Sequence, residues 1–147
     1  MNIEFTSAQY EKLIKMAYLG EWMINSYAIG EESKKEYEEL LSHILSFASK
    51  EGLEKFVFKD PASGQCDFSN ELFDDPEVCG FIDKYNEDTF WAELAHRLVD
   101  RDFLRKYKLE ERKKMTKEDF IEKTIEIERT YNKEFETHGL QNLEIKK

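Results

Sequence analysis

The chain contains little cysteine, proline or glycine: two, two and six residues, respectively, among 147. The two cysteines, Cys66 and Cys79, are 13 positions apart, a spacing that fits neither a disulfide framework nor a pair of zinc ligands. Six glycines leave little material for a phosphate-binding loop, and the Gly-x-Ser-x-Gly elbow of many hydrolases is missing from the sequence. We therefore expect reduced thiols, no metal and no cofactor, and the residues favour a non-enzymatic role.

Long apolar runs are also missing. No stretch approaches the roughly 20 apolar residues that a membrane-spanning helix needs. The first ten residues, MNIEFTSAQY, lack the basic segment and the apolar stretch of a secretory signal. These absences predict a cytoplasmic protein that does not enter a membrane.

Charged and aromatic residues, in contrast, are abundant. Charged residues form 37% of the chain, against about 25% in ordinary globular domains. Such a charge content is typical of disordered chains, but these chains contain few aromatic residues, whereas 14% of this chain is aromatic. The length and the aromatic content together predict one folded domain over residues 1–147.

Helix signals are clear along most of the chain. Thr6 and Gln9 have the spacing of a capping box, and Phe5 and Tyr10 that of the accompanying hydrophobic staple, which predicts a helix over about 7–27. Similar caps and stops predict four further helices, over about 33–52, 76–85, 86–107 and 116–139.

Extended structure has much weaker signals. Residues 2–5, 55–59 and 142–145 are the candidate strands, and the first and last of them would pair the termini. Residues 60–74 contain the turn markers of a loop and are acidic. We therefore predict an all-α or mainly α fold: a compact single domain of about five helices, with at most a very short terminal β pairing.

The net charge of −10 is distributed very unevenly. Residues 60–96 hold ten acidic residues and one basic residue, whereas residues 97–117 hold nine basic residues and four acidic ones. Acidic residues near helix N-termini and basic residues near a C-terminus also suit the helix dipole, so a purely solvated surface explains part of this pattern.

The acidic segment suggests a surface for a protein partner, and the partner would be basic or would itself handle nucleic acid. On this hypothesis the protein is a regulator, inhibitor or adaptor, and its carboxylates would present charge to the partner or mimic the phosphates of a nucleic acid. Aromatic and aliphatic side chains within the segment would anchor the contact. The candidate surface residues are Asp67, Phe68, Glu71, Leu72, Phe73, Asp74, Asp75, Glu77, Asp83, Glu87 and Asp88.

Two alternatives remain open. The basic stretch 97–117 is interleaved with aromatic residues and would contact nucleic-acid phosphates directly. Polar residues on the apolar faces of two predicted helices would instead form a buried cluster, either a structural ion pair between Glu21 and Arg101 or a ligand pocket. This cluster consists of Glu21, Asn25, Arg101 and Asp102.

Overall fold

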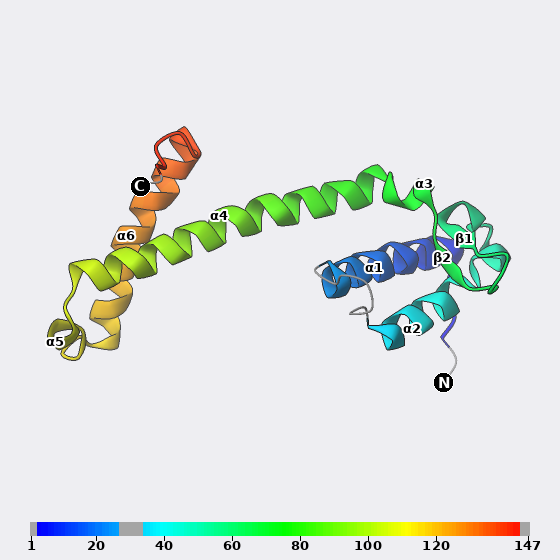
Figure 1. Cartoon of the computed structure of the whole chain (residues 1–147), viewed down its shortest axis with the longest axis horizontal. Helices are drawn as coiled ribbons and strands as arrows, with labels where there is room; N and C mark the ends of the chain where they lie inside the picture. The colour runs from blue at the N-terminus through cyan, green and yellow to red at the C-terminus, as the bar shows by residue number, and fades with distance from the viewer. Residues whose placement is uncertain (1–2, 27–33, 145–147) are drawn as a thin grey trace. The chain divides into compact units, whose positions relative to one another are not determined.

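A computed structural model of the chain describes residues 3–26 and 34–144 (Figure 1). The described residues are mainly α-helical, which confirms the predicted fold class. The chain divides into unit 1 (Met1–Asp83) and unit 2 (Lys84–Lys147), which are described separately below. That the whole chain forms one domain stays a prediction.

Unit 1 combines helices with a short β-hairpin (Figure 1). Its two main helices are α1 (Ser7–Asn25) and α2 (Lys35–Leu45), which pack against each other. The elements that follow are η2 (Ala48–Glu51), η3 (Glu54–Phe56), β1 (Val57–Lys59), β2 (Cys66–Phe68), α3 (Asn70–Phe73) and the first turns of α4 (Pro76–Lys106).

The capping box predicted at the start of α1 is confirmed. The backbone N–H of Gln9 donates to Thr6 Oγ1 at 3.3 Å, and the backbone N–H of Thr6 donates to Gln9 Oε1 at 2.9 Å. The predicted end of the first helix, near residue 27, and the predicted start of the second, at Ser33, lie outside the described residues. The second predicted helix extended to Gly52, but α2 ends at Leu45, and Gly52 instead ends the 3-10 helix η2 with a φ of 71°.

The prediction of a loop over residues 60–74 is wrong in part, because this range contains β2 and α3. Strand β2 pairs antiparallel with β1, with Val57 opposite Phe68 and Lys59 opposite Cys66. Gly64 takes a φ of 73° in the turn between the strands. The sheet is therefore a hairpin rather than a terminal pairing, and the described residues 3–5 and 142–144 are not in strands.

The core of unit 1 lies between α1, α2 and the start of α4. Ile14, Leu45, Leu72 and Val78 are its largest fully buried side chains. The hydroxyl of Tyr10, also buried, donates to the backbone carbonyl of Ile44 and so ties α1 to α2.

Unit 2 contains the remainder of α4, α5 (Leu109–Arg112) and α6 (Lys117–His138). The predicted helix boundary at Asn86 is wrong, because α4 continues through this residue to Lys106. No proline or glycine lies near Asn86 to interrupt the helix, and Lys84 and Asp88 form an ion pair across it at 2.7 Å. The capping box at Thr116, in contrast, is confirmed, and α6 is followed by Gly139 as predicted.

Helix α6 runs back along α4 within unit 2, and aromatic contacts join the two helices. The ring centroids of Phe103 and Phe120 are 5.0 Å apart, and those of Trp91 and Phe135 are 5.2 Å apart. The buried apolar side chains of this unit are Ala95, Val99, Phe103 and Phe135.

Candidate functional site

The two units differ sharply in charge. Unit 1 contains 17 acidic and seven basic residues, a net charge of −10, whereas unit 2 contains 15 of each. The whole net charge of the chain therefore belongs to unit 1. Any site that works by negative charge is expected there.

The acidic residues of unit 2 that were predicted to face a partner are paired with their own helix. Glu87 accepts a hydrogen bond from the indole N–H of Trp91, and Asp88 pairs with Lys84 at 2.7 Å. A partner would therefore compete with existing contacts at both carboxylates.

Two predicted surface residues of unit 1, Asp75 and Glu77, are paired in the same way. Lys15 Nζ lies 2.9 Å from a carboxylate oxygen of each, and Lys12 Nζ lies 2.6 Å from Glu77 Oε1. Asp75 also caps α4, because its Oδ1 accepts hydrogen bonds from the backbone N–H groups of Glu77 and Val78 at 3.0 and 3.1 Å.

The electrostatics of this network follow from burial and hydrogen bonding. Burial alone would raise the pKa of Asp75, but the hydrogen bond and the charge of Lys15, together with the backbone N–H groups of Val78 and Glu77, outweigh burial and lower the pKa. Hydrogen bonds from Lys12 and Lys15 lower the pKa of Glu77. Burial alone would lower the pKa of Lys15, but its carboxylate partners raise it instead. These shifts keep Asp75, Glu77 and Lys15 charged at neutral pH, and the ion pairs hold α1 against the start of α4.

The predicted apolar anchors need correction. Phe68 and Leu72 are buried in the core of unit 1, so these side chains are not available to a partner. Phe68 ends a short strand and Leu72 lies in the single turn of α3, and neither element is long enough for the local sequence pattern to reveal which side chains face the core. The predicted surface residues of unit 1 that are exposed are Asp67, Glu71, Phe73, Asp74, Glu77 and Asp83.

Carboxylates from three separate segments of unit 1 surround a surface hollow of about 680 Å³, which we name the acidic hollow. The segments are the last turns of α1, helix α2 and the β-hairpin with its turn. One basic residue, Lys35, lies among the lining residues. The lining residues are Glu21, Lys35, Glu38, Glu39, Leu41, Ser42, Phe58, Asp60, Gln65, Cys66 and Asp67.

Three of these carboxylates accept local hydrogen bonds that fix their positions. Glu21 Oε1 accepts from the side-chain amide of Asn25 at 3.0 Å, and Asp67 Oδ1 accepts from the backbone N–H of Phe68 at 2.7 Å. Asp60 accepts from the hydroxyl and the backbone N–H of Ser63, and these hydrogen bonds lower the pKa of Asp60. None of these three makes an ion pair with a described residue, so no basic side chain of the described residues neutralises them.

Glu38 and Glu39 are the least engaged carboxylates of the acidic hollow. Both are exposed on α2, and neither makes an ion pair or a side-chain hydrogen bond with any residue in the described ranges. Neither residue is among the candidates predicted from the sequence. The run Glu38-Glu39 is visible in the sequence, but only the fold places it opposite the hairpin.

More than half of the basic residues of the stretch 97–117 are paired within unit 2. Five of its nine basic residues form ion pairs with acidic residues of the same unit at 2.7 to 3.8 Å. These residues are Arg97, Arg101, Arg105, Lys106 and Lys113.

The four residues of the predicted polar cluster form two pairs, one in each unit. Glu21 and Asn25 are hydrogen-bonded in unit 1, and Arg101 Nε donates to Asp102 Oδ1 at 2.7 Å in unit 2. Arg101 is exposed and Asp102 is partly exposed. The ion pair between Glu21 and Arg101 stays a prediction, because these residues belong to different units.

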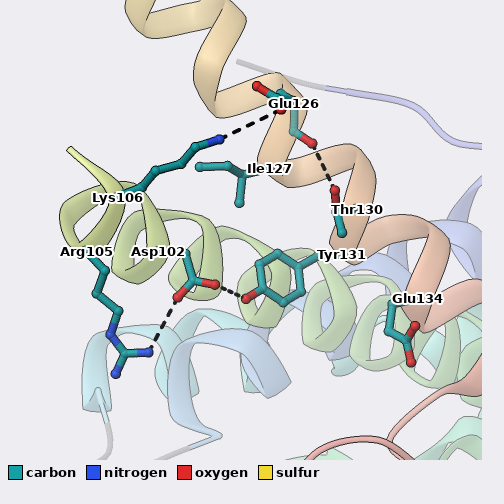
Figure 2. Close-up of a pocket in the computed structure, with 8 residues that line it drawn as sticks. All are labelled: Asp102, Arg105, Lys106, Glu126, Ile127, Thr130, Tyr131 and Glu134. Atoms are coloured by element: carbon teal, nitrogen blue, oxygen red, sulfur yellow. Dashed lines mark hydrogen bonds and ion pairs between the residues drawn. The ribbon is translucent and has the colours of Figure 1, made fainter.

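Asp102 belongs to a hollow of about 520 Å³ between α4 and α6 (Figure 2). The hydroxyl of Tyr131 donates to Asp102, and Arg105 pairs with the same carboxylate at 3.6 Å. Hydrogen bonds from Arg101 and Tyr131 lower the pKa of Asp102. Lys106 pairs with Glu126 across this hollow at 3.8 Å. Most charged groups around the hollow are therefore paired with a group of opposite charge.

No protein-family model, curated protein or solved structure matches the chain. Within residues 3–26 and 34–144, no group of three or more His, Cys, Asp or Glu residues is arranged to hold a metal ion. No helix in the same ranges is both long enough and apolar enough to cross a bilayer.

Proposed function

We propose that this protein is a cytoplasmic, non-enzymatic binding protein that takes a Lys/Arg-rich segment of a protein partner into the acidic hollow of unit 1. It would act as a regulator, inhibitor or adaptor. The observation that carries the proposal is the convergence of five carboxylates, from α1, α2 and the hairpin, around one hollow with a single basic residue.

The charge of unit 1 supports this choice of partner. A net charge of −10 attracts a basic segment over distances comparable to the Debye length, which is about 8 Å at physiological ionic strength. Glu38 and Glu39 make no internal ion pair in the described part of the chain, so a partner need not displace one. The acidic residues of α4 are different, because most of them already have a partner.

Phe58 gives the acidic hollow an aromatic wall. Its side chain is 54% exposed although it belongs to a strand, and it lines the hollow beside the carboxylates. A guanidinium or ammonium group is attracted to an aromatic face as well as to carboxylates. This combination favours Arg or Lys side chains over a simple inorganic cation.

The nucleic-acid alternative has less support. A strong, salt-sensitive contact with phosphates needs several basic groups that are free to neutralise them. Five of the nine basic residues of 97–117 are paired internally, and unit 2 has no net charge. We therefore do not propose direct nucleic-acid binding.

The test is the affinity of the full chain for a fluorescently labelled 12-residue peptide of Arg, Lys and Ser, measured by fluorescence anisotropy. Glu38→Gln/Glu39→Gln should weaken binding by about tenfold, because two charge contacts at roughly 0.7 kcal/mol each are lost. The matched control is Glu71→Gln/Asp74→Asn, which removes the same charge from exposed positions of unit 1 outside the hollow. It should change the affinity by less than about twofold.

Equal weakening by both double variants would contradict the proposal, because it would show attraction to the net charge alone. Unchanged binding in Glu38→Gln/Glu39→Gln would also contradict it. Retention of duplex DNA at low salt, with loss after charge reversal of Arg112, Lys113 and Lys114, would favour the nucleic-acid alternative instead.

A further inference from the structure

The outer face of α1 carries an exposed apolar stripe. The side chains of Met16 and Met23 are 68% and 55% exposed, and they lie on the same side of the helix because seven residues make almost two full turns. Ile14, on the opposite side, is completely buried in the core. The second half of α1 is apolar nearly all round in sequence, and it includes a face that the described residues of unit 1 do not cover.

Gly20 lies between these two methionines and keeps the face flat. A glycine within a helix costs up to about 1 kcal/mol relative to alanine. A Cβ atom added to Gly20 would have nothing within 4 Å, and Gly20 is not among the glycines with positive φ. Neither the packing nor the backbone of the described residues requires a glycine here, whereas the close approach of an external helix would use its missing side chain.

The first turns of α4 extend this face. Lys12 Nζ contacts Glu77 Oε1 at 2.6 Å, which shows where α1 meets the first turn of α4. Met16 lies one turn beyond Lys12, and Phe81 lies one turn beyond Glu77. Phe81, which is 52% exposed, therefore lies on the part of α4 that contacts α1. We name Met16, Met23 and Phe81 the apolar patch.

The charge of unit 1 limits what can cover the apolar patch. A second copy of the chain would bring two units of net charge −10 together, and an anionic membrane would be repelled in the same way. A cationic partner is attracted instead. Methionine side chains are flexible and polarisable, which suits a surface that adapts to the apolar side of a helix.

We propose that the apolar patch docks the apolar side of an amphipathic helix whose polar side is rich in Lys and Arg. The patch is separate from the acidic hollow, because Glu21, which lines the hollow, lies about 140° around α1 from Met16. The inference therefore shares with the proposed function a cationic partner, but it does not require binding in the hollow.

The test uses an 18-residue Leu/Lys peptide designed as an amphipathic helix, with affinity measured by fluorescence anisotropy on the full chain. Met16→Gln/Met23→Gln should weaken binding by about tenfold, since glutamine keeps the helix propensity and approximate length but loses the apolar contact. The matched control is Ile3→Gln/Leu40→Gln, which replaces two similarly exposed aliphatic side chains elsewhere on unit 1. This control should stay within about twofold of the unmodified chain.

Failure of the two proposals can be distinguished. If Glu38→Gln/Glu39→Gln abolishes binding of the Leu/Lys peptide and the methionine variant does not, the patch inference is wrong while the acidic hollow stands. If the methionine variant abolishes it but the Arg/Lys/Ser peptide never binds, the hollow is wrong and the patch stands.

Three other results would overturn the patch inference by showing a different occupant. The first is a dimer in sedimentation that dissociates in Met16→Gln/Met23→Gln. The second is a fall of more than about 5 °C in the melting temperature of this variant without peptide, which would show that the chain itself covers the patch. The third is binding of the unmodified chain to phosphatidylcholine vesicles that is lost in the variant.

Discussion

At the scale of single residues, Lys15 is a charged side chain buried at the contact between α1 and α4. Its side chain is only 8% exposed, and its Nζ lies 2.9 Å from Asp75 and 3.4 Å from Glu11. Its main partners lie about 60 positions later in the sequence. A helical pattern identifies the faces of α1, but it cannot show which distant carboxylates reach Lys15.

Replacing Lys15 by methionine should therefore destabilise the fold. The substitution keeps the apolar stem but leaves the nearly buried carboxylate of Asp75 without its cation, which costs about 3 kcal/mol. The free energy of unfolding from urea titrations measures this loss. Lys12→Met is the control. Lys12 also pairs with Glu77, one of the partners of Lys15, but from an exposed position, so this substitution should cost less than about 1 kcal/mol.

The pH dependence gives an independent check of the same contact. The pKa values of Asp75 and Glu77 are lowered in the folded protein, so the stability they contribute is present above their unfolded pKa values of about 4. It is lost as the pH falls further, through the folded pKa values. The difference in unfolding free energy between the unmodified chain and Lys15→Met should shrink over this range. A constant difference from pH 7 to pH 3 would contradict the assignment.

Two adjacent residues of β2 show why the sequence did not reveal which side chains lie on the surface. Asp67 and Phe68 are neighbours, yet Asp67 lines the acidic hollow and Phe68 is buried in the core. Such alternation is normal for a strand, but three residues are too few to reveal it without knowledge of the pairing with β1. The acidic side chains were therefore easier to place on the surface than the apolar ones.

At the scale of elements, local signals predicted the helix starts well. The capping boxes at Thr6 and Thr116 depend on residues three positions apart, so the sequence alone contains the whole interaction. The wrong boundary predicted at Asn86 also came from a purely local signal. Asparagine is a good cap, but it is also tolerated inside a helix when the flanking residues support helical structure.

The two interpretations of Asn86 predict opposite effects for Asn86→Ala. Inside α4, alanine should raise the free energy of unfolding by about 0.5 kcal/mol, because alanine has the higher helix propensity. If Asn86 capped a separate helix, the same change would lower it by about 1 kcal/mol. Urea unfolding followed by circular dichroism decides between them, and Thr116→Ala, at a true cap, is the control that should lose about 1 kcal/mol.

At the scale of the whole molecule, residues 60–96 carry most of the net negative charge along the sequence. In the fold, the whole net charge of −10 belongs to unit 1. The acidic hollow takes carboxylates from positions as far apart as Glu21 and Asp67. A linear count of charge cannot reveal such a site, since the fold determines which acidic residues meet and which are paired internally. Only Asp67 and Glu21 of the hollow were among the residues chosen from the sequence.

The central claim is that a basic protein segment binds in the acidic hollow, and nuclear magnetic resonance tests it most directly. The Arg/Lys/Ser peptide is titrated into the isotopically labelled full chain, and the backbone amide shifts are followed. We expect the largest changes at residues 35–42 and 58–67, weakened in Glu38→Gln/Glu39→Gln, because these segments surround the hollow. Changes confined to residues 97–117, or spread evenly over the surface of unit 1, would contradict the account.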